Sequence, residues 1–93
     1  MPITEKNLVR HELIGLEVEI VKSTNKYQIG IKGKVIDETY NTLTIETNKK
    51  EKKVAKKDCV FVFTLPNGKK VQVEGWILVG KPEDRIKKKF SKW

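Results

Sequence analysis

A chain of 93 residues that carries 20 Lys and Arg against 12 Asp and Glu has a formal net charge of +8. This length leaves little room for a second core, so we expect residues 1–93 to form a single domain. The positive charge favours nucleic acid as a partner, although a lysine-rich surface can also be merely solvated. No apolar run approaches the roughly 18 residues that a membrane span needs.

The cysteine content and the first residues bear on the cellular compartment. One cysteine, Cys59, cannot form an internal disulfide, which agrees with a reducing environment. The first 15 residues lack the basic-then-apolar pattern of a secretory signal. We therefore expect a cytoplasmic protein with no membrane association.

The chain begins with a short helix predicted over residues 4–13. Thr4 can cap its start, and a partial apolar stripe consists of Leu8, Val9 and Leu13. A strand is predicted over residues 16–21, where outward-facing carboxylates belong to Glu17 and Glu19. Because the stripe is more apolar than an exposed helix needs, we expect it to bind a protein partner together with these two glutamates.

The middle of the chain alternates strands and polar turns. A turn over residues 23–26 precedes a strand predicted over residues 28–37, whose outward face carries Lys32 and Lys34. The polar sequence DETYNT leads into a strand predicted over residues 42–47. A charged tip, NKKEKK, then precedes a short strand around residues 53–56.

The last third predicts a hairpin and a second helix. Residues 59–65 form a strand that is buried on one face, and Asn67-Gly68 supplies the positive backbone angles of a tight reversal. The return strand is predicted over residues 69–77. Pro82 suits the first position of a helix predicted over residues 82–91.

These elements predict a mainly all-β fold. Five or six short strands in so small a chain favour a closed or nearly closed antiparallel barrel over residues 15–80, flanked by short N- and C-terminal helices. Gly33 and Gly75 are each expected at an inward strand position, where they would permit the sharp bends of a small barrel.

The residues give little support to catalysis within the chain. One histidine and one cysteine cannot form a metal cluster with zinc-like spacing or a credible nucleophile pair. Asp37 and Glu38 are adjacent, but neighbours on an extended chain point to opposite faces. A structural role is favoured, with Asp37 bonding backbone donors near Asn41. We expect no catalytic residue, no metal site and no bound cofactor.

Three groups of polar and basic residues predict a nucleic-acid surface. They are the first turn with Lys22, Ser23 and Asn25, the strand face with Lys32 and Lys34, and the last helix with Arg85 and Lys88. Lysine neutralises phosphates without reading sequence, so such a surface binds with salt-sensitive affinity. Tyr27, Tyr40 and Trp76 are candidates for base stacking, although for Trp76 the favoured interpretation is that it covers the end of the barrel against a terminal helix.

Three segments in series resemble archaeal ribonuclease P protein component 1. They read HELIGLEVEIVKSTN, GIKGKVIDETYNTLTIET and CVFVFTLPNGKKVQVEGWILVGKPEDRIKK. The resemblance implies a twisted Sm-like barrel and an RNA-binding subunit of the ribonucleoprotein that removes 5′ leaders from precursor tRNA. In that family the RNA performs the chemistry with Mg²⁺, and the N-terminal helix and neighbouring strand contact a zinc-binding protein subunit.

The alternative is a generic Sm-like RNA-binding protein, such as an RNA chaperone or a ribosomal protein. An Sm-like chaperone closes into a ring through strand pairing, which the terminal helices would obstruct. We therefore expect a monomer when isolated. In the complex, its partners are ribonuclease P RNA, the zinc-binding subunit and other ribonuclease P proteins, and it meets precursor tRNA only indirectly. A small acid–base enzyme on a barrel is a third, weaker interpretation.

Overall fold

The computed structural model describes Leu8 and residues 12–80 of the chain. The helix predicted over residues 82–91 lies outside this part, as do the predicted site residues Val9, Arg85 and Lys88. Within the helix predicted over residues 4–13, Glu12 and Leu13 have no helical structure. That prediction therefore extends the helix too far along the chain.

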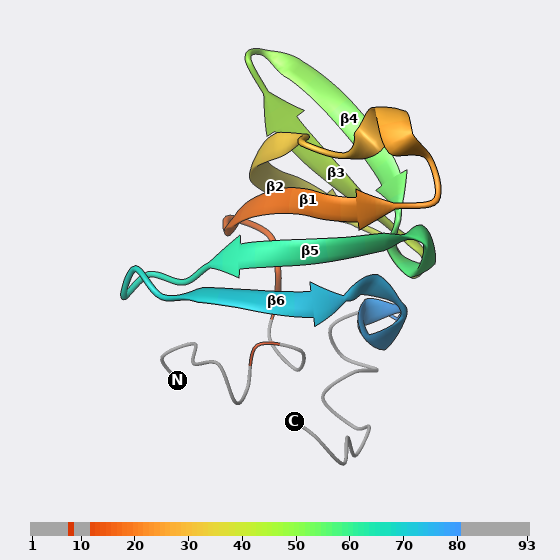
Figure 1. Cartoon of the computed structure of the whole chain (residues 1–93). Coiled ribbons are helices and arrows are strands. Elements are labelled where there is room, and N and C mark those ends of the chain that lie inside the picture. The colour runs from red at the N-terminus through yellow and green to blue at the C-terminus, as the bar shows by residue number, and fades with distance from the viewer. Residues whose placement is uncertain (1–7, 9–11, 81–93) are drawn as a thin grey trace.

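Six antiparallel strands form a single sheet (Figure 1). The strands are β1 (Glu17–Ser23), β2 (Lys32–Glu38), β3 (Thr42–Thr47), β4 (Lys50–Ala55), β5 (Cys59–Thr64) and β6 (Lys70–Glu74). Two 3-10 helices, η2 (Lys26–Gln28) and η3 (Lys56–Asp58), lie between strands, and a further one, η4 (Gly75–Leu78), follows β6. The order β4-β3-β2-β1-β5-β6 leaves β4 and β6 as the two edges. The mainly all-β prediction is confirmed, but the predicted closure is wrong, because β6 passes into η4 rather than pairing with β4.

Two strands begin several residues away from where they were predicted to begin. The strand predicted over residues 28–37 starts later, because Lys26–Gln28 forms η2. The charged tip at residues 48–53 is mostly strand, because Asn48 and Lys49 alone make the turn, with φ angles of 46° and 66°. The bounds predicted for β3 are confirmed.

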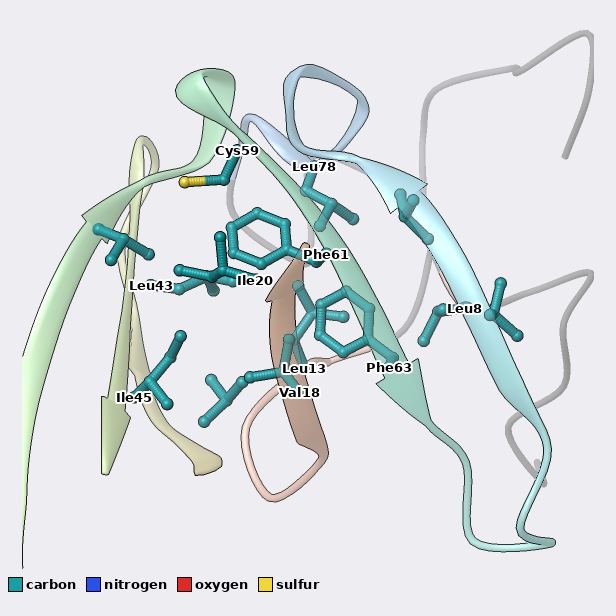
Figure 2. Close-up of a cluster of buried hydrophobic side chains, with 14 of the residues drawn as sticks. Leu8, Leu13, Val18, Ile20, Leu43, Ile45, Cys59, Phe61, Phe63 and Leu78 are labelled. Carbon is teal, nitrogen blue, oxygen red and sulfur yellow. The ribbon is translucent and has the colours of Figure 1, made fainter. Parts of the chain in front are cut away.

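The core lies on the inner face of the curved sheet (Figure 2). Alternate strand residues and η4 supply most of it, namely Val18, Ile20, Val35, Leu43, Ile45, Val54, Cys59, Phe61, Phe63, Val71, Val73 and Leu78. The rings of Phe61 and Phe63 lie side by side, with centroids 5.9 Å apart. The two-residue periodicity of the sequence thus has its physical cause in a sheet with one apolar face.

Leu8 and Leu13 also belong to this core, and neither has any exposed surface (Figure 2). Full burial of a leucine side chain contributes roughly 1.5–3 kcal/mol. The prediction that these two leucines form an exposed stripe for a protein partner is therefore wrong. An open sheet of this size needs further apolar cover, and the two leucines contribute to it.

A β-bulge in β1 decides which way its last residues face. The register against β5 shifts between Ile20 and Lys22. A bulge adds one residue and reverses the alternation of side chains beyond it. Lys22 therefore joins the outer face of the sheet, and Ser23 turns inward opposite Cys59.

A second bulge has the same effect on β2. The register against β3 shifts between Val35 and Asp37, so Glu38 lies opposite the buried Leu43. Asp37 is consequently exposed. The prediction that Asp37 holds the following turn is wrong, because the bulge gives the inward position to Glu38 instead.

Two glycines allow close approaches of backbone rather than bends. A Cβ atom at Gly33 would overlap the carbonyl oxygen of Glu46 on the neighbouring strand. A Cβ atom at Gly75 would overlap the carbonyl oxygens of Lys56 and Cys59. Gly75 begins η4, so the prediction that it lies within a strand is wrong. Its lack of a side chain lets η4 pack directly against η3.

Lys56 is buried at the start of η3 with no exposed surface. Its Nζ donates to Glu38 Oε2 at 2.7 Å, and the Glu38 side chain is only 1% exposed. The same ammonium donates to the backbone carbonyl oxygens of Thr39 at 2.8 Å and Gly80 at 2.9 Å. These acceptors replace the water that the charge has lost. We call this group of contacts the Lys56 junction.

The Lys56 junction generates a stability prediction. Replacing Lys56 by Met leaves a buried carboxylate and two carbonyls without their donor, so the free energy of unfolding should fall by about 3–5 kcal/mol. The neighbouring Lys57 is exposed. Lys57→Met is the matched control and should change stability by no more than about 0.5 kcal/mol. Urea unfolding followed by circular dichroism measures both, and equal effects of the two variants would contradict the assignment.

Candidate nucleic-acid interface

The outer face of the sheet brings together three of the predicted RNA-binding lysines. Lys32 and Lys34 project from β2, and both are exposed. Lys22 reaches the same face through the bulge in β1. The outer face is defined here by these three lysines together with Glu17 and Glu19 of β1.

Strand register sets each of the β2 lysines opposite a carboxylate. Glu19 faces Lys32, and Glu17 faces Lys34. On the other side of β2, Glu46 also faces Lys34. Directly opposed residues in an antiparallel pair have Cβ atoms only about 4.5–5.5 Å apart. The outer face therefore has mixed charge, and Glu17 and Glu19, which were predicted to bind a protein partner, share it with three of the lysines predicted to bind RNA.

A small hollow lies on this face where β1 meets its two neighbours. It is lined by Glu17, Val18, Glu19, Lys32, Val62, Thr64 and Lys70. Two lysines and two glutamates are thus among the residues that line it. Such a surface suits an extended polyanion or a charged protein segment better than a small apolar ligand.

The turn after β1 is held by its own polar side chains. Ser23 Oγ donates to Gln28 Oε1 at 3.0 Å and accepts from the amide of Asn25 at 3.1 Å. Asn25 Oδ1 accepts from the amide of Tyr27 at 3.0 Å and so caps η2. The side chains of Ser23 and Asn25, both predicted to bind RNA, therefore stabilise the turn itself. Lys22, which precedes them, extends into solvent.

Cys59 contacts the same turn from the inner face. Its thiol lies 3.6 Å from both Ser23 Oγ and Gln28 Oε1. Burial raises the pKa of the Cys59 thiol, the hydrogen bond to Ser23 opposes this, and the charge of Asp58 raises the pKa further. The thiol is consequently protonated at neutral pH, and its position agrees with the prediction of a small core residue.

Two further features of the described residues concern other kinds of site. No group of three or more His, Cys, Asp or Glu side chains that could hold a metal ion occurs among them. Nor does this part of the chain contain a helix long and apolar enough to cross a membrane. The exposed lysines of β4, which the sequence analysis left outside the site, lie along a free edge of the sheet.

Sequence reasoning missed the role of Lys56 and Glu38. One signal was available, since alternation from the inward Val54 gives Lys56 an inward position as well. No comparable signal exists for Glu38, because its inward position depends on the bulge in β2. Trp76 is 61% exposed, which does not support the favoured interpretation that it covers the end of the barrel.

Comparison with known proteins identifies the family of the chain. The family described as ribonuclease P/MRP, subunit p29, matches residues 6–88. Ribonuclease P protein component 1 of Methanosphaera stadtmanae is 54% identical over 90 residues, which is 97% of each chain. The protein of the same name from Methanocaldococcus jannaschii is 58% identical over 90 residues, covering 96% of this chain and 94% of the relative.

A solved structure gives the same result for the fold. It is described as a homologue of the human RNase P protein Rpp29, and it superposes with a TM-score of 0.60 at 48% sequence identity. The match covers 82% of this chain and 99% of the solved one. The chain therefore belongs to the ribonuclease P/MRP subunit p29 family and is a protein subunit of ribonuclease P.

Proposed function

We propose that this subunit binds the RNA of ribonuclease P and takes no direct part in bond cleavage. The observation that carries the proposal is the gathering of Lys22, Lys32 and Lys34 on one face of the sheet. A net charge of +8 supports a polyanionic partner, and family membership makes the ribonuclease P RNA the partner to test first. The subunit would support the RNA in removing 5′ leaders from precursor tRNA.

The chemistry is assigned to the RNA and its Mg²⁺ ions rather than to this chain. Magnesium is bound in proteins through carboxylate oxygens and water. The carboxylates on the outer face fit that role poorly, because Glu17 and Glu19 each have a lysine directly opposite. A neighbouring ammonium competes with a metal cation for the same oxygens. These glutamates are better suited to a protein contact.

The zinc-binding ribonuclease P subunit is proposed as the protein partner. Its contact would use Glu17 and Glu19, since the buried Leu8 and Leu13 are not available for it. Precursor tRNA would be met only through the assembled complex. The isolated chain is proposed to be a cytoplasmic monomer. The edge strand β4 supports the monomer, because its exposed lysines oppose pairing with a second edge.

Reconstitution tests the proposed function directly. The cognate catalytic RNA, Mg²⁺ and the other protein subunits are combined with and without this chain, and cleavage of precursor tRNA is measured. Cleavage should increase when the chain is added, because its lysines neutralise phosphates that otherwise oppose folding of the RNA. The chain alone, free of RNA, should show no cleavage. Cleavage by the RNA-free chain would contradict the proposal. Equal cleavage of precursor tRNA by the complex with and without this chain would contradict it as well.

The outer face predicts a particular salt dependence of RNA binding. Each lost phosphate contact reduces the slope of log affinity against log salt by about 0.7–0.9. Combined Lys22→Ala, Lys32→Ala and Lys34→Ala substitutions should therefore reduce the slope by about 2–3. A matched control removes three exposed lysines from β4 instead, by Lys50→Ala, Lys52→Ala and Lys53→Ala. Filter binding across a salt series measures both variants.

The β4 variant loses the same charge and should retain most of the slope. If the β4 variant loses more of the salt slope than the outer-face variant, the RNA surface lies at the β4 edge and the assignment to the outer face is wrong. Glu17→Gln provides a test of opposite sign, because it removes the carboxylate opposite Lys34. It should tighten RNA binding by about two- to fivefold, which corresponds to ~0.4–1 kcal/mol.

A further inference from the structure

Three aromatic side chains are left in solvent although the core is rich in apolar residues. Tyr27 is 86% exposed, Trp76 is 61% exposed and Tyr40 is 48% exposed. Among the described residues, only Ile14 and Ile29 join them as exposed large hydrophobic side chains. Exposing three aromatic rings gains nothing for the stability of so small a domain. Their placement therefore indicates a contact made outside the chain.

All three aromatic residues lie in segments that dock onto η3. The amide of Thr24, at the start of the turn that carries Tyr27, donates to the carbonyl oxygen of Asp58 at 3.0 Å. The Lys56 ammonium contacts the carbonyl oxygen of Tyr40 at 3.3 Å. The backbone of Gly75, which precedes Trp76, packs against the Lys56 carbonyl oxygen. We call the end of the sheet that carries these three rings the aromatic end.

Figure 1 shows the same arrangement. The 3-10 helix after β1, the one after β4 and the one after β6 all lie at the end of the sheet toward which these three strands point. The turn between β2 and β3 joins this end through the bond from the Lys56 amide to the Asn41 carbonyl oxygen, 2.8 Å long. Segments far apart in sequence, each carrying one of the three aromatic residues, thus lie at the same end of the sheet.

The backbone beneath each ring is fixed. Asn25 caps the turn at the Tyr27 amide. The indole Nε1 of Trp76 donates to Glu74 Oε2 at 3.2 Å, and the Tyr40 carbonyl accepts from the amide of Gly80 at 2.7 Å. A contact surface that is already ordered loses less entropy on binding than a flexible one. The backbone that carries the three rings, and the indole of Trp76 itself, are therefore held in place before a partner binds.

Among the residues that the structure describes, the charged side chains near the rings are of both signs. Lys26 and Lys57 are exposed at this end, while Asp58 is partly buried and Glu74 is exposed beside Trp76. Phosphate attraction is therefore not the main interaction that this end offers. Aromatic faces flanked by a few lysines match the sites at which unpaired bases stack, where each base contributes through its π-face whatever its identity.

We propose that the aromatic end binds unpaired nucleotides of an RNA by stacking their bases on Tyr27, Tyr40 and Trp76. This inference rests on the proposed RNA-binding function and adds a second surface to it, distinct from the lysines of the outer face. A duplex buries its base faces within its own stack, so the aromatic end discriminates against paired RNA. The site recognises strandedness rather than sequence.

Leucine substitutions test the proposal, because leucine keeps the apolar bulk but has no π-face. Tyr27→Leu and Trp76→Leu in the full chain should each weaken binding of a single-stranded oligouridylate by about 5- to 100-fold. Binding to an RNA duplex of equal length, and the salt slope for either ligand, should stay unchanged. Ile14→Ala is the control, since it alters an exposed apolar side chain outside the aromatic end. Fluorescence anisotropy gives the affinities, and circular dichroism verifies the fold.

A spectroscopic measurement tests the same contact without disturbing it. Trp93→Phe leaves Trp76 as the single tryptophan of the chain. Oligouridylate should quench its emission in proportion to binding, whereas an unchanged emission at saturation would overturn a role for Trp76.

The pattern of outcomes separates this inference from the proposed function. If the outer-face lysine variants change the salt slope while the leucine variants bind single strands normally, the aromatic end is not an RNA site but RNA binding stands. If the leucine variants instead lose association with another protein subunit, the aromatic end is a protein contact and the inference is overturned. If the wild-type chain binds no RNA at all, both proposals fail.

Discussion

A lysine with no exposed surface holds one end of this sheet together. Moving an ammonium out of water costs several kcal/mol, so its burial is tolerated only where acceptors surround it. At Lys56 a carboxylate and two carbonyl oxygens lie within 2.9 Å of Nζ, and the Tyr40 carbonyl lies slightly farther away. Those acceptors come from the end of β2, from the turn after it and from Gly80. A single side chain therefore joins three segments, in addition to the backbone hydrogen bonds between them.

The functional surfaces depend on this junction and on the two bulges. The bulge in β2 delivers Glu38 to Lys56, and the bulge in β1 delivers Lys22 to the outer face. Gly75 then brings η4 against η3, which sets Trp76 at the same end as Tyr27 and Tyr40. In the proposed function, the lysines of the outer face would make salt-sensitive contact with phosphates, and the aromatic end would add stacking that salt affects little. Together they would let one small domain bind an RNA that is partly paired and partly single-stranded.

Much of the sheet was predictable because the alternation of apolar and polar residues along a strand is visible in a short stretch of sequence. The bounds of β3, the reversal after β5 and the inward row of Phe61 and Phe63 all follow from residues adjacent in sequence, although only Gly68 of the predicted Asn67-Gly68 pair has a positive φ, of 87°. The bulges were not predictable, because each depends on how the strand pairs with another strand and not on its own residues alone. For this reason the prediction gave the structural role at the end of β2 to Asp37, whereas Glu38 has it.

The candidate site was harder to predict for the same reason. The exposure of Lys32 and Lys34 followed from alternation, but their glutamate neighbours depend on cross-strand register. Leu8 looked like part of an exposed stripe because a helical pattern does not reveal which face the rest of the chain covers. The inward position of Lys56 was readable from Val54, yet its burial depends on the carbonyls that surround it.

A double-mutant cycle between Lys56 and Glu38 tests the central claim most directly. Glu38→Gln, Lys56→Met and the double variant are unfolded in urea, and their free energies of unfolding are compared with that of the wild-type chain. If the buried pair acts as one unit, Glu38→Gln costs far less in the Lys56→Met background, with a coupling energy of about 1–3 kcal/mol. Additive effects, with a coupling energy below about 0.5 kcal/mol, would contradict the account that this ion pair holds the end of the sheet together.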